Sequence, residues 1–281
     1  MSDSLQRVHF DRNRQTSGNW ASFASHRTKV RSLLEEHLHP HARSICILGA
    51  GNVNDLDLPW LAERFHTVTL IDLDEAAMSA GVVRQLGSAI PAGLTTIRLD
   101  VTGVFNRLNT LVSSSAPLNT ADLDEIRTLL AARPVATPFN EQFDCVVSTC
   151  LLSQLIDTVK TSIGEQHREF VPTVQAIRAQ HLALAAQLTH KQGLIAIIFD
   201  FVSSLTCPQL GEVTESQLAA LAMEQIARHN FFTGLNPQLV QRSLESELSR
   251  YGKVPTVLTT PWRWNLGPRI YLVTALLASL P

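Results

Sequence analysis

The chain has 281 residues, 45% of them hydrophobic, and a formal net charge of −2, as is common in globular proteins. The near-neutral charge gives no general reason to expect nucleic acid or an anionic membrane as a partner. No apolar run reaches the length of about eighteen residues that a membrane span needs, and residues 1–7 lack the apolar core of a signal peptide. We therefore expect a cytoplasmic protein that binds neither nucleic acid nor a membrane.

The four cysteines are scattered and form no C-x-x-C pair. Cys46 and Cys145 lie inside apolar runs that are typical of buried strands, whereas Cys150 and Cys207 lie elsewhere. This pattern favours buried free thiols in a reducing compartment over disulfides or metal ligands. No metal site is predicted, and the sequence does not indicate an oligomeric state.

The N-terminal segment predicts an arm followed by one helix. Residues 1–18 are polar, and we expect an arm of uncertain order. From Trp20 onward apolar residues recur at helical spacing until His39-Pro40, which ends the pattern. This helix either packs on the edge of a sheet or forms a lid over a ligand, with His26 and Arg27 facing inward.

The next stretch is a strand, residues 44–48, that ends in the turn Gly49-Ala50-Gly51 and continues into a helix capped by Asp57. A strand that ends in a glycine turn and enters a helix is typical of nucleotide sites, because the glycines let the backbone approach the ligand. Taken alone the signal is weak, since Asn54 stands where the G-x-G-x-x-G pattern has its third glycine.

Two further strands are predicted to end in carboxylates, residues 67–72 at Asp72 and residues 95–100 at Asp100. Alternating strands and helices predict a parallel sheet that binds its ligand at the carboxyl edge of the strands. Asp72 lies about twenty residues after the glycines, as expected of a carboxylate that accepts hydrogen bonds from ribose hydroxyls. The structural alternative is an Asp that begins a loop with an Asx turn.

The remaining expected elements alternate between helices and strands, and the last two strands are antiparallel because their connector is too short for a helical crossover. In chain order they are helices at 104–112 and 121–132 around a flexible segment at 113–117, a strand at 143–148 with a corner at 149–155, a helix from Pro172 to Gly193, a central strand at 194–199 that leaves the sheet after Asp200, helices at 215–228 and 237–251, and strands at 256–260 and 269–275 joined by the connector 262–268.

The order of these elements resembles the class I S-adenosylmethionine-dependent methyltransferases over about residues 40–281. The best-matching pieces are residues 45–51, 70–72, 99–100 and 143–148. The resemblance implies an α/β fold: a doubly wound, mostly parallel seven-stranded sheet with an antiparallel C-terminal strand, helices on both faces and a helical N-terminal cap. It divides the chain into residues 1–40, an arm and cap helix, and residues 41–281, a Rossmann-like domain with helical insertions at about 103–140, 155–190 and 203–250.

The resemblance also implies roles for individual residues. The glycine turn lies against the methionine part of the S-adenosylmethionine cofactor, Asp72 holds the ribose, Asp100 touches the adenine, and the corner after the fourth strand faces the methyl group and its acceptor. The implied cofactor-binding residues are Gly49, Ala50, Gly51, Asn54, Asp55, Asp72, Leu73, Asp100, Val101, Ser148 and Thr149. The acceptor-pocket candidates are Cys150, Gln154 and Trp262.

Two positions depart from the family pattern. Ile47 stands where the family often has an acidic residue, and Val53 stands where it often has a third glycine. Asp55 is a candidate to receive the cofactor's ammonium group in place of the missing acid. The alternative is that Asp55 only begins the helix.

We expect a methyltransferase that acts on a small or medium organic acceptor, because the insertions are large enough to wall in a site. An oxygen or nitrogen acceptor can also need a base, for which His167 and His229 are the candidates, whereas His181 and His190 are expected to be structural or solvated. Trp262 and Trp264 alternate, so that both can face the acceptor or pack at the sheet edge.

Two other functions remain open. A nicotinamide-dependent oxidoreductase would use the same glycine turn and Asp72. Asp100, the antiparallel C-terminal pair and the missing third glycine speak against it. The other alternative is a catalytically inactive nucleotide-binding protein with the same fold.

Overall fold

A computed structural model describes residues 4–113, 119–132, 135, 137–138 and 141–281 of the chain. Most of the segment at 113–117 that was expected to be flexible therefore lies outside the described residues. The helix expected at 121–132 spans Thr120–Ala131, and the Asn119 side chain caps its first turn by accepting the backbone N–H of Ala121.

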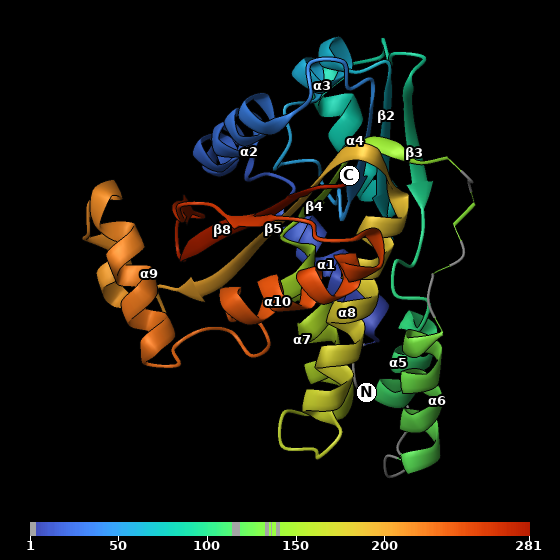
Figure 1. The fold of residues 1–281 in the computed structure, drawn as a ribbon, viewed down its shortest axis with the longest axis vertical. Coiled ribbons are helices and arrows are strands. Elements are labelled where there is room, and N and C mark those ends of the chain that lie inside the picture. The colour runs from blue at the N-terminus through green and yellow to red at the C-terminus, as the bar shows by residue number, and fades with distance from the viewer. Residues whose placement is uncertain (1–3, 114–118, 133–134, 136, 139–140) are drawn as a thin grey trace.

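The centre of the molecule is an eight-stranded mixed sheet with the order β3-β2-β1-β4-β5-β8-β6, in which β7 also pairs with β8 (Figure 1). The first five strands run parallel, and β6 and β7 pair with β8 in the antiparallel sense, as β8 does with β5. Their bounds are β1 Ser44–Leu48, β2 Thr67–Asp72, β3 Leu94–Arg98, β4 Phe143–Thr149, β5 Thr189–Ser203, β6 Thr256–Leu258, β7 Trp262–Asn265 and β8 Ile270–Ser279.

Helices cover both faces of the sheet, as predicted (Figure 1). They are α1 Leu5–Thr16, α2 Ala24–His37, α3 Leu58–Arg64, α4 Glu75–Leu86, α5 Phe105–Ser113, α6 Thr120–Ala131, α7 Leu151–Ile163, α8 Phe170–Leu188, α9 Leu218–Ala227 and α10 Pro237–Leu248. Short 3₁₀ helices span Trp20–Phe23, Pro208–Gly211, Glu215–Gln217 and Ser249–Tyr251.

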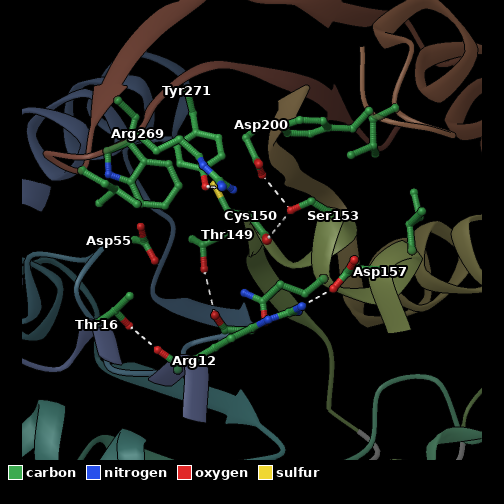
Figure 2. A pocket seen from close by; sticks show the side chains of 18 of the residues that line it. Arg12, Thr16, Asp55, Thr149, Cys150, Ser153, Asp157, Asp200, Arg269 and Tyr271 are labelled. Carbon is green, nitrogen blue, oxygen red and sulfur yellow. Dashed lines mark hydrogen bonds and ion pairs between the residues drawn. The ribbon is translucent and has the colours of Figure 1, made fainter. Parts of the chain in front are cut away.

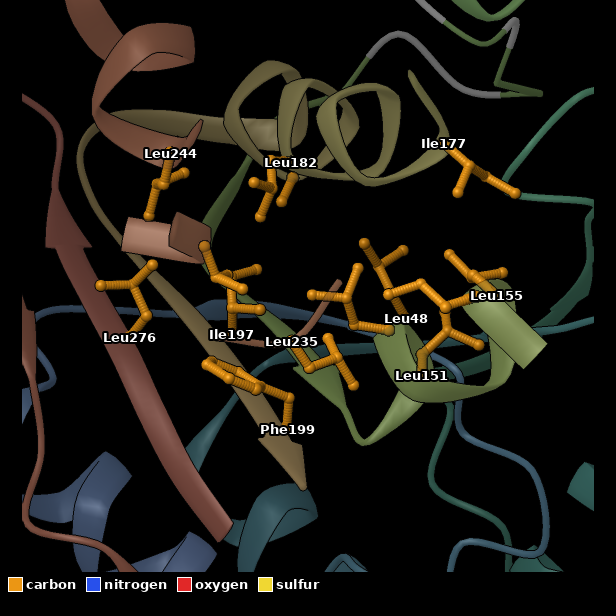
Figure 3. Close-up of a cluster of buried hydrophobic side chains, with 14 of the residues drawn as sticks. Leu48, Leu151, Leu155, Ile177, Leu182, Ile197, Phe199, Leu235, Leu244 and Leu276 are labelled. Atoms are coloured by element: carbon orange, nitrogen blue, oxygen red, sulfur yellow. The ribbon is translucent and has the colours of Figure 1, made fainter. Parts of the chain in front are cut away.

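Alternating residues of β1 show how the two faces are divided. Cys46 and Leu48 belong to a hydrophobic cluster with α5 to α10 (Figure 3), whereas Ile45 and Ile47 belong to a second cluster with α2, α3 and α4. Because both faces are covered, the central strands β1 and β4 are buried over almost their whole length, whereas the edge strand β3 is partly exposed. All four cysteines are buried free thiols, as predicted.

Four predictions about elements were wrong. The helix expected from Pro172 to Gly193 ends at Leu188, because β5 already begins at Thr189. The N-terminal arm is not irregular but contains α1, which Ser4 caps by accepting the N–H of Arg7. The connector at 262–268 contains a strand, β7, so that the sheet has eight strands rather than seven. The chain does not leave the sheet after Asp200, because β5 continues to Ser203 beside β8 across an irregularity at 200–202.

No helix in the part of the chain that the structure describes is long and apolar enough to cross a membrane.

Candidate active site

A cavity of about 750 Å³ opens at the carboxyl edge of the parallel strands (Figure 2). It is lined by the turn after β1, the corner after β4 and Asp200 of β5. Its other walls come from α1, the 228–236 segment and the β7–β8 hairpin. This volume is within the range of about 300–1,000 Å³ that is typical of small-molecule sites.

The glycine turn is held tightly under this cavity. Gly49 has a φ of +80°, and a Cβ atom there would lie 2.7 Å from Cβ of Leu151 on α7. The N–H groups of Gly49 and Ala50 both donate to the carbonyl of Ile71, and the Thr149 hydroxyl donates to the Gly49 carbonyl at 3.1 Å. A side chain at position 49 would therefore separate β1 from α7, so the glycine is required by packing as well as by its φ.

The two departures from the family pattern have different structural consequences. Val53, at the position of the missing glycine, has a φ of +58°, the left-handed conformation that favours glycine. The turn thus keeps a glycine-like backbone although its residue is a buried valine. Ile47 is fully buried in the second hydrophobic cluster, so that no group at that position reaches the cavity.

Asp55 lines the cavity, and its side chain is 15% exposed. The indole N–H of Trp262 donates to Nδ1 of His26 at 3.1 Å. An indole nitrogen can only donate, so Nδ1 is unprotonated and the imidazole proton is on Nε2. Nε2 lies 3.2 Å from Oδ1 of Asp55, within ion-pair range but without hydrogen-bond geometry. Among the described residues, Oδ1 therefore has no hydrogen-bond partner. Asn54 also lines the cavity, but its amide is already bonded to Thr16 and Arg84.

Asp72 lines a second, smaller cavity of about 50 Å³ that adjoins the first and shares Gly49 with it. The N–H groups of Gly51 and Asp74 donate to its two carboxylate oxygens, each at 2.9 Å. Burial raises the pKa of Asp72. An ionised carboxylate offers about four acceptor positions, so Asp72 keeps capacity for a further donor from a ligand.

Asp100 also lines the second cavity, together with the predicted residues Leu73 and Val101. Its Oδ1 accepts from the backbone N–H and the hydroxyl of Thr102, and its Oδ2 accepts from the N–H of Phe105. Asp100 therefore caps the start of α5, which leaves its carboxylate largely occupied by backbone donors.

Helix α1 forms the roof of the second cavity. His9 and Asn13 line it, and Oδ1 of Asn13 lies 3.2 Å from the position of a Cβ on Gly51. Asn13 also donates to Asp74, and His9 is bonded to Thr158 of α7 at 2.8 Å. The space under α1 is therefore far smaller than a nucleoside.

Past the glycine turn, a buried polar group occupies the floor of the main cavity. Ser153 donates its hydroxyl to Oδ1 of Asp200 at 2.7 Å, and Asp200 is only 6% exposed. Burial raises the pKa of Asp200, and the charge of Asp55 adds to the rise. Burial, with the charges of Asp200 and Asp55, raises the pKa of the Cys150 thiol well above its usual range, so that Cys150 stays protonated. Cys150 has a φ of +46°, a strained conformation for a residue with a side chain.

Aromatic rings form one wall of the main cavity. Phe23, Trp264, Tyr271 and Phe232 all line it and contact one another in that order, with centroid distances of 5.0, 5.5 and 6.3 Å. The rings come from an N-terminal 3₁₀ helix, from β7 and β8, and from the 228–236 segment, which are far apart in the sequence.

Most of the predicted site residues are brought together, but some are not. Gly49, Ala50, Gly51, Asn54, Asp55, Thr149, Cys150 and Gln154 line the main cavity, and Leu73, Asp72, Asp100 and Val101 line the smaller one. Ser148 is fully buried and bonded to His181 at 2.8 Å, and it lines neither cavity. Trp262 supports His26 from behind, whereas Trp264 lines the main cavity. His167 and His229 line neither of these two cavities.

Sequence reasoning missed Asp200, Tyr271 and Arg12 as lining residues, whereas Ser153 lies in the predicted corner after the fourth strand. Asp200 had a usable signal, because it follows an apolar strand just as Asp72 does, at the same edge of the sheet. Arg12 had none, since the helix that carries it was not predicted.

No protein-family model and no curated protein matches the chain. Among solved structures, the chain is similar to one described as a possible exported protein from Bordetella parapertussis, with 13% identity, coverage of 91% of this chain and 67% of that one, and a TM-score of 0.46. It is similar to the N-methyltransferase NodS from Bradyrhizobium japonicum, with 10% identity, 93% and 97% coverage, and a TM-score of 0.44. It is also similar to a SAM-dependent methyltransferase from Methanosarcina mazei, with 10% identity, 88% and 96% coverage, and a TM-score of 0.46.

At such low identities and TM-scores, these similarities do not define an activity for this chain. The fold is assigned instead from the strand order of this structure. The order of its parallel strands and the antiparallel strands at its C-terminal end are those of the Rossmann-like fold that the resemblance to class I S-adenosylmethionine-dependent methyltransferases implies.

Proposed function

We propose that the protein is an S-adenosylmethionine-dependent methyltransferase that acts on a small or medium organic acceptor. The observation that carries the proposal is the pair of adjoining cavities that share Gly49, with Asp55 among the carboxylates that line the first and Asp72 among those that line the second. An elongated ligand with an ammonium group at one end and a ribose at the other fits this arrangement of acceptors.

The lining residues fit the cofactor at both ends. Asp55 lines the main cavity with its side chain 15% exposed, and its Oδ2, the oxygen that is not opposite His26, takes no hydrogen bond from the described residues and can accept one from an ammonium group. Asp72 is fixed by two backbone donors and keeps room for a ribose hydroxyl. Gly49 and Gly51 let the backbone lie close to a ligand between these two groups.

The adenosine end requires α1 to shift, because the space under it is about 50 Å³. Polar contacts of Asn13 and Asn52 hold α1 in place: Asn13 donates to Asp74, and Asn52 donates to the Asn13 carbonyl. The bond to the Asp74 carboxylate contributes about 1.5–3 kcal/mol and the neutral bond from Asn52 about 1 kcal/mol, so a ligand that displaces the helix must gain new contacts of at least this size under it. Helix α1 is therefore the element that would open to admit the nucleoside and close over it.

Bound S-adenosylmethionine supplies an activated methyl group on a sulfonium sulfur. The protein's part is to hold donor and acceptor in line and to exclude water. The walls from α1, the 228–236 segment and the β7–β8 hairpin enclose the main cavity, and Thr149 ties the glycine turn to β4 so that the floor stays rigid.

Calorimetry with S-adenosylhomocysteine and with NADH tests the proposal. We expect S-adenosylhomocysteine to bind and NADH not to bind. Binding of NADH alone would overturn the proposal in favour of an oxidoreductase. Binding of S-adenosylhomocysteine without turnover of any acceptor would favour a catalytically inactive protein of the same fold.

A further inference from the structure

The charges of the side chains that line the main cavity do not sum to zero. Arg12 is paired with Asp157, and Lys160 is paired with Glu165 at 3.0 Å, so these four residues contribute little net charge. Two carboxylates remain, Asp55 and Asp200, and the third cation that lines the cavity, Arg269, is exposed.

Arg269 does not neutralise either carboxylate directly. It donates to the hydroxyl of Tyr271 at 3.3 Å, and no ion pair joins it to an acid among the described residues. Figure 2 shows Asp55 and Asp200 on opposite sides of Cys150. The interior of the cavity therefore carries an excess of negative charge, which favours a cationic ligand group.

Asp200 is built to receive such a group. Asp200 is only 6% exposed. The Ser153 hydroxyl has a single proton, which it donates to Oδ1 at 2.7 Å, and the Cys150 carbonyl lies 3.1 Å from the same hydroxyl oxygen as a competing acceptor. The backbone N–H of Asp200 also donates to its own carboxylate, and Ser153 is the one side chain among the described residues that donates to it. A buried carboxylate is costly unless it is paired, so a cation that reaches Oδ2 would relieve this cost.

The aromatic wall lies beside Asp200. Tyr271 enters the cavity from β8, the strand that pairs with β5, and the Asp200 carboxylate is close enough to add to the rise that burial causes in the pKa of the Tyr271 hydroxyl. Trp264 packs behind it at a centroid distance of 5.5 Å. Aromatic faces attract cations and also bury apolar groups, so this wall suits both the charged end and the body of an organic amine.

We propose that Asp200 and the aromatic wall of Trp264 and Tyr271 form an acceptor subsite for a primary or secondary amine with an aromatic or other apolar body. This inference rests on the proposed function, because it names the acceptor class of the same site. It assigns Asp55 to the ammonium group of the cofactor and Asp200 to the nitrogen of the acceptor.

The chemistry of the step follows from these positions. A protonated amine has no lone pair to give, so it first transfers one proton to Asp200, which becomes a neutral carboxylic acid. The amine lone pair then forms the new N–C bond as the C–S bond breaks, and the electron pair of that bond stays on sulfur as a thioether. The product amine carries the positive charge that the sulfonium loses, and charge is conserved.

A binding experiment without turnover tests the subsite. Calorimetry on the full chain compares two amines with the alcohols of the same shape: 2-phenylethylamine with 2-phenylethanol, and tryptamine with tryptophol. We expect at least one amine to bind about tenfold more tightly than its alcohol, as is usual when a hydrogen bond to a charged group is added. Asp200→Asn should remove this preference, whereas Glu63→Gln, an exposed change of the same charge on α3, should leave it intact.

The outcomes separate the two proposals. If neither wild-type amine binds more tightly than its alcohol, the subsite is wrong, and this result does not depend on whether a variant folds. A preference that survives in folded Asp200→Asn also overturns it. If the amine preference and its loss in Asp200→Asn are found but S-adenosylhomocysteine does not bind, the amine subsite stands and the methyltransferase proposal fails.

Discussion

Asp55 is the residue on which the methionine end of the proposed site depends most. Asp55→Asn keeps the shape of the side chain and does not touch the hydrogen bond between Trp262 and His26 next to it. What the variant loses is the negative charge that faces the main cavity. The change is therefore directed at ligand binding rather than at the fold.

The expected size of the effect follows from the kind of contact that is lost. A hydrogen bond between charged groups contributes about 1.5–3 kcal/mol, which corresponds to a loss of at least about tenfold in affinity for a ligand with an ammonium group. The side chain is mostly buried, at 15% exposed, so solvent screens the contact only in part. We expect S-adenosylhomocysteine to bind at least about tenfold more weakly to Asp55→Asn.

The assay uses two ligands that differ only at the amino-acid end. 5′-Methylthioadenosine keeps the nucleoside and the sulfur of S-adenosylhomocysteine but lacks its ammonium and carboxylate groups. Calorimetry should show that Asp55→Asn weakens S-adenosylhomocysteine and leaves 5′-methylthioadenosine within about twofold. Asp72→Asn, at the ribose end, should weaken both ligands alike. Equal losses for the two ligands in Asp55→Asn would refute the assignment of the ammonium group to Asp55.

The other predictions concern the roof, the floor and the core of the molecule. Asn13→Ala removes the hydrogen bond from α1 to Asp74 and should speed the association of S-adenosylhomocysteine several-fold in stopped-flow fluorescence; an unchanged rate would show that α1 does not limit entry. Gly49→Ala should lower the free energy of unfolding in urea by about 2 kcal/mol or more, because the new methyl group meets Leu151 at a positive φ, and a neutral effect would contradict the packing described for the turn. Burial lowers the pKa of His181 to about 4, so the folded state binds fewer protons than the unfolded state between about pH 4 and 6.5. The stability that this histidine contributes is therefore full above about pH 6.5 and is lost as the pH falls. The free energy of unfolding should fall by about 2 kcal/mol between pH 7.5 and 5. His181→Gln should remove that part of the pH dependence. If urea titrations at pH 7.5 and 5 gave the same change in the free energy of unfolding for the variant as for the wild type, the prediction would be wrong.

The parallel half of the fold was predictable because its signals are local. Residues 44–48 and 67–72 read as strands from their apolar and β-branched residues alone, and the structure has both with the predicted bounds. Helix α4 also has local signals at both ends, because the Asp74 side chain caps it by accepting the N–H of Ala77 and Gly87 follows its last residue. These elements carry their own turn and capping chemistry, so that no knowledge of their neighbours is needed.

The elements that were missed depend on contacts with distant parts of the chain. Helix α1 has few apolar residues, and polar contacts with Asn52 and Asn109 hold it on the sheet edge. Strand β7 forms because β8 pairs with it. The end of β5, at residues 202–203, stays in the sheet because β8 also pairs with it there. Local sequence does not encode such pairings, since strands are stabilised mainly by their partners.

The candidate site also has residues that the local sequence predicts and residues that it does not. The glycine turn and Asp72 were predictable from their spacing, and the structure brings them to adjoining cavities. The pairing of Ser153 with Asp200 and the aromatic wall of Phe23, Trp264 and Tyr271 arise only when α7, β5, β8 and the N-terminal segment meet. Sequence spacing cannot show this because the residues are separated by more than two hundred positions in the case of Phe23 and Trp264.

The most direct test of the central claim is a crystal structure of the protein with S-adenosylhomocysteine. We predict a nucleoside under a displaced α1 with its ribose at Asp72, the amino-acid part over Gly49, and the ammonium group at Asp55. Density for a ligand that leaves Asp72 and Asp55 without contact, or that lies away from the glycine turn altogether, would contradict the account.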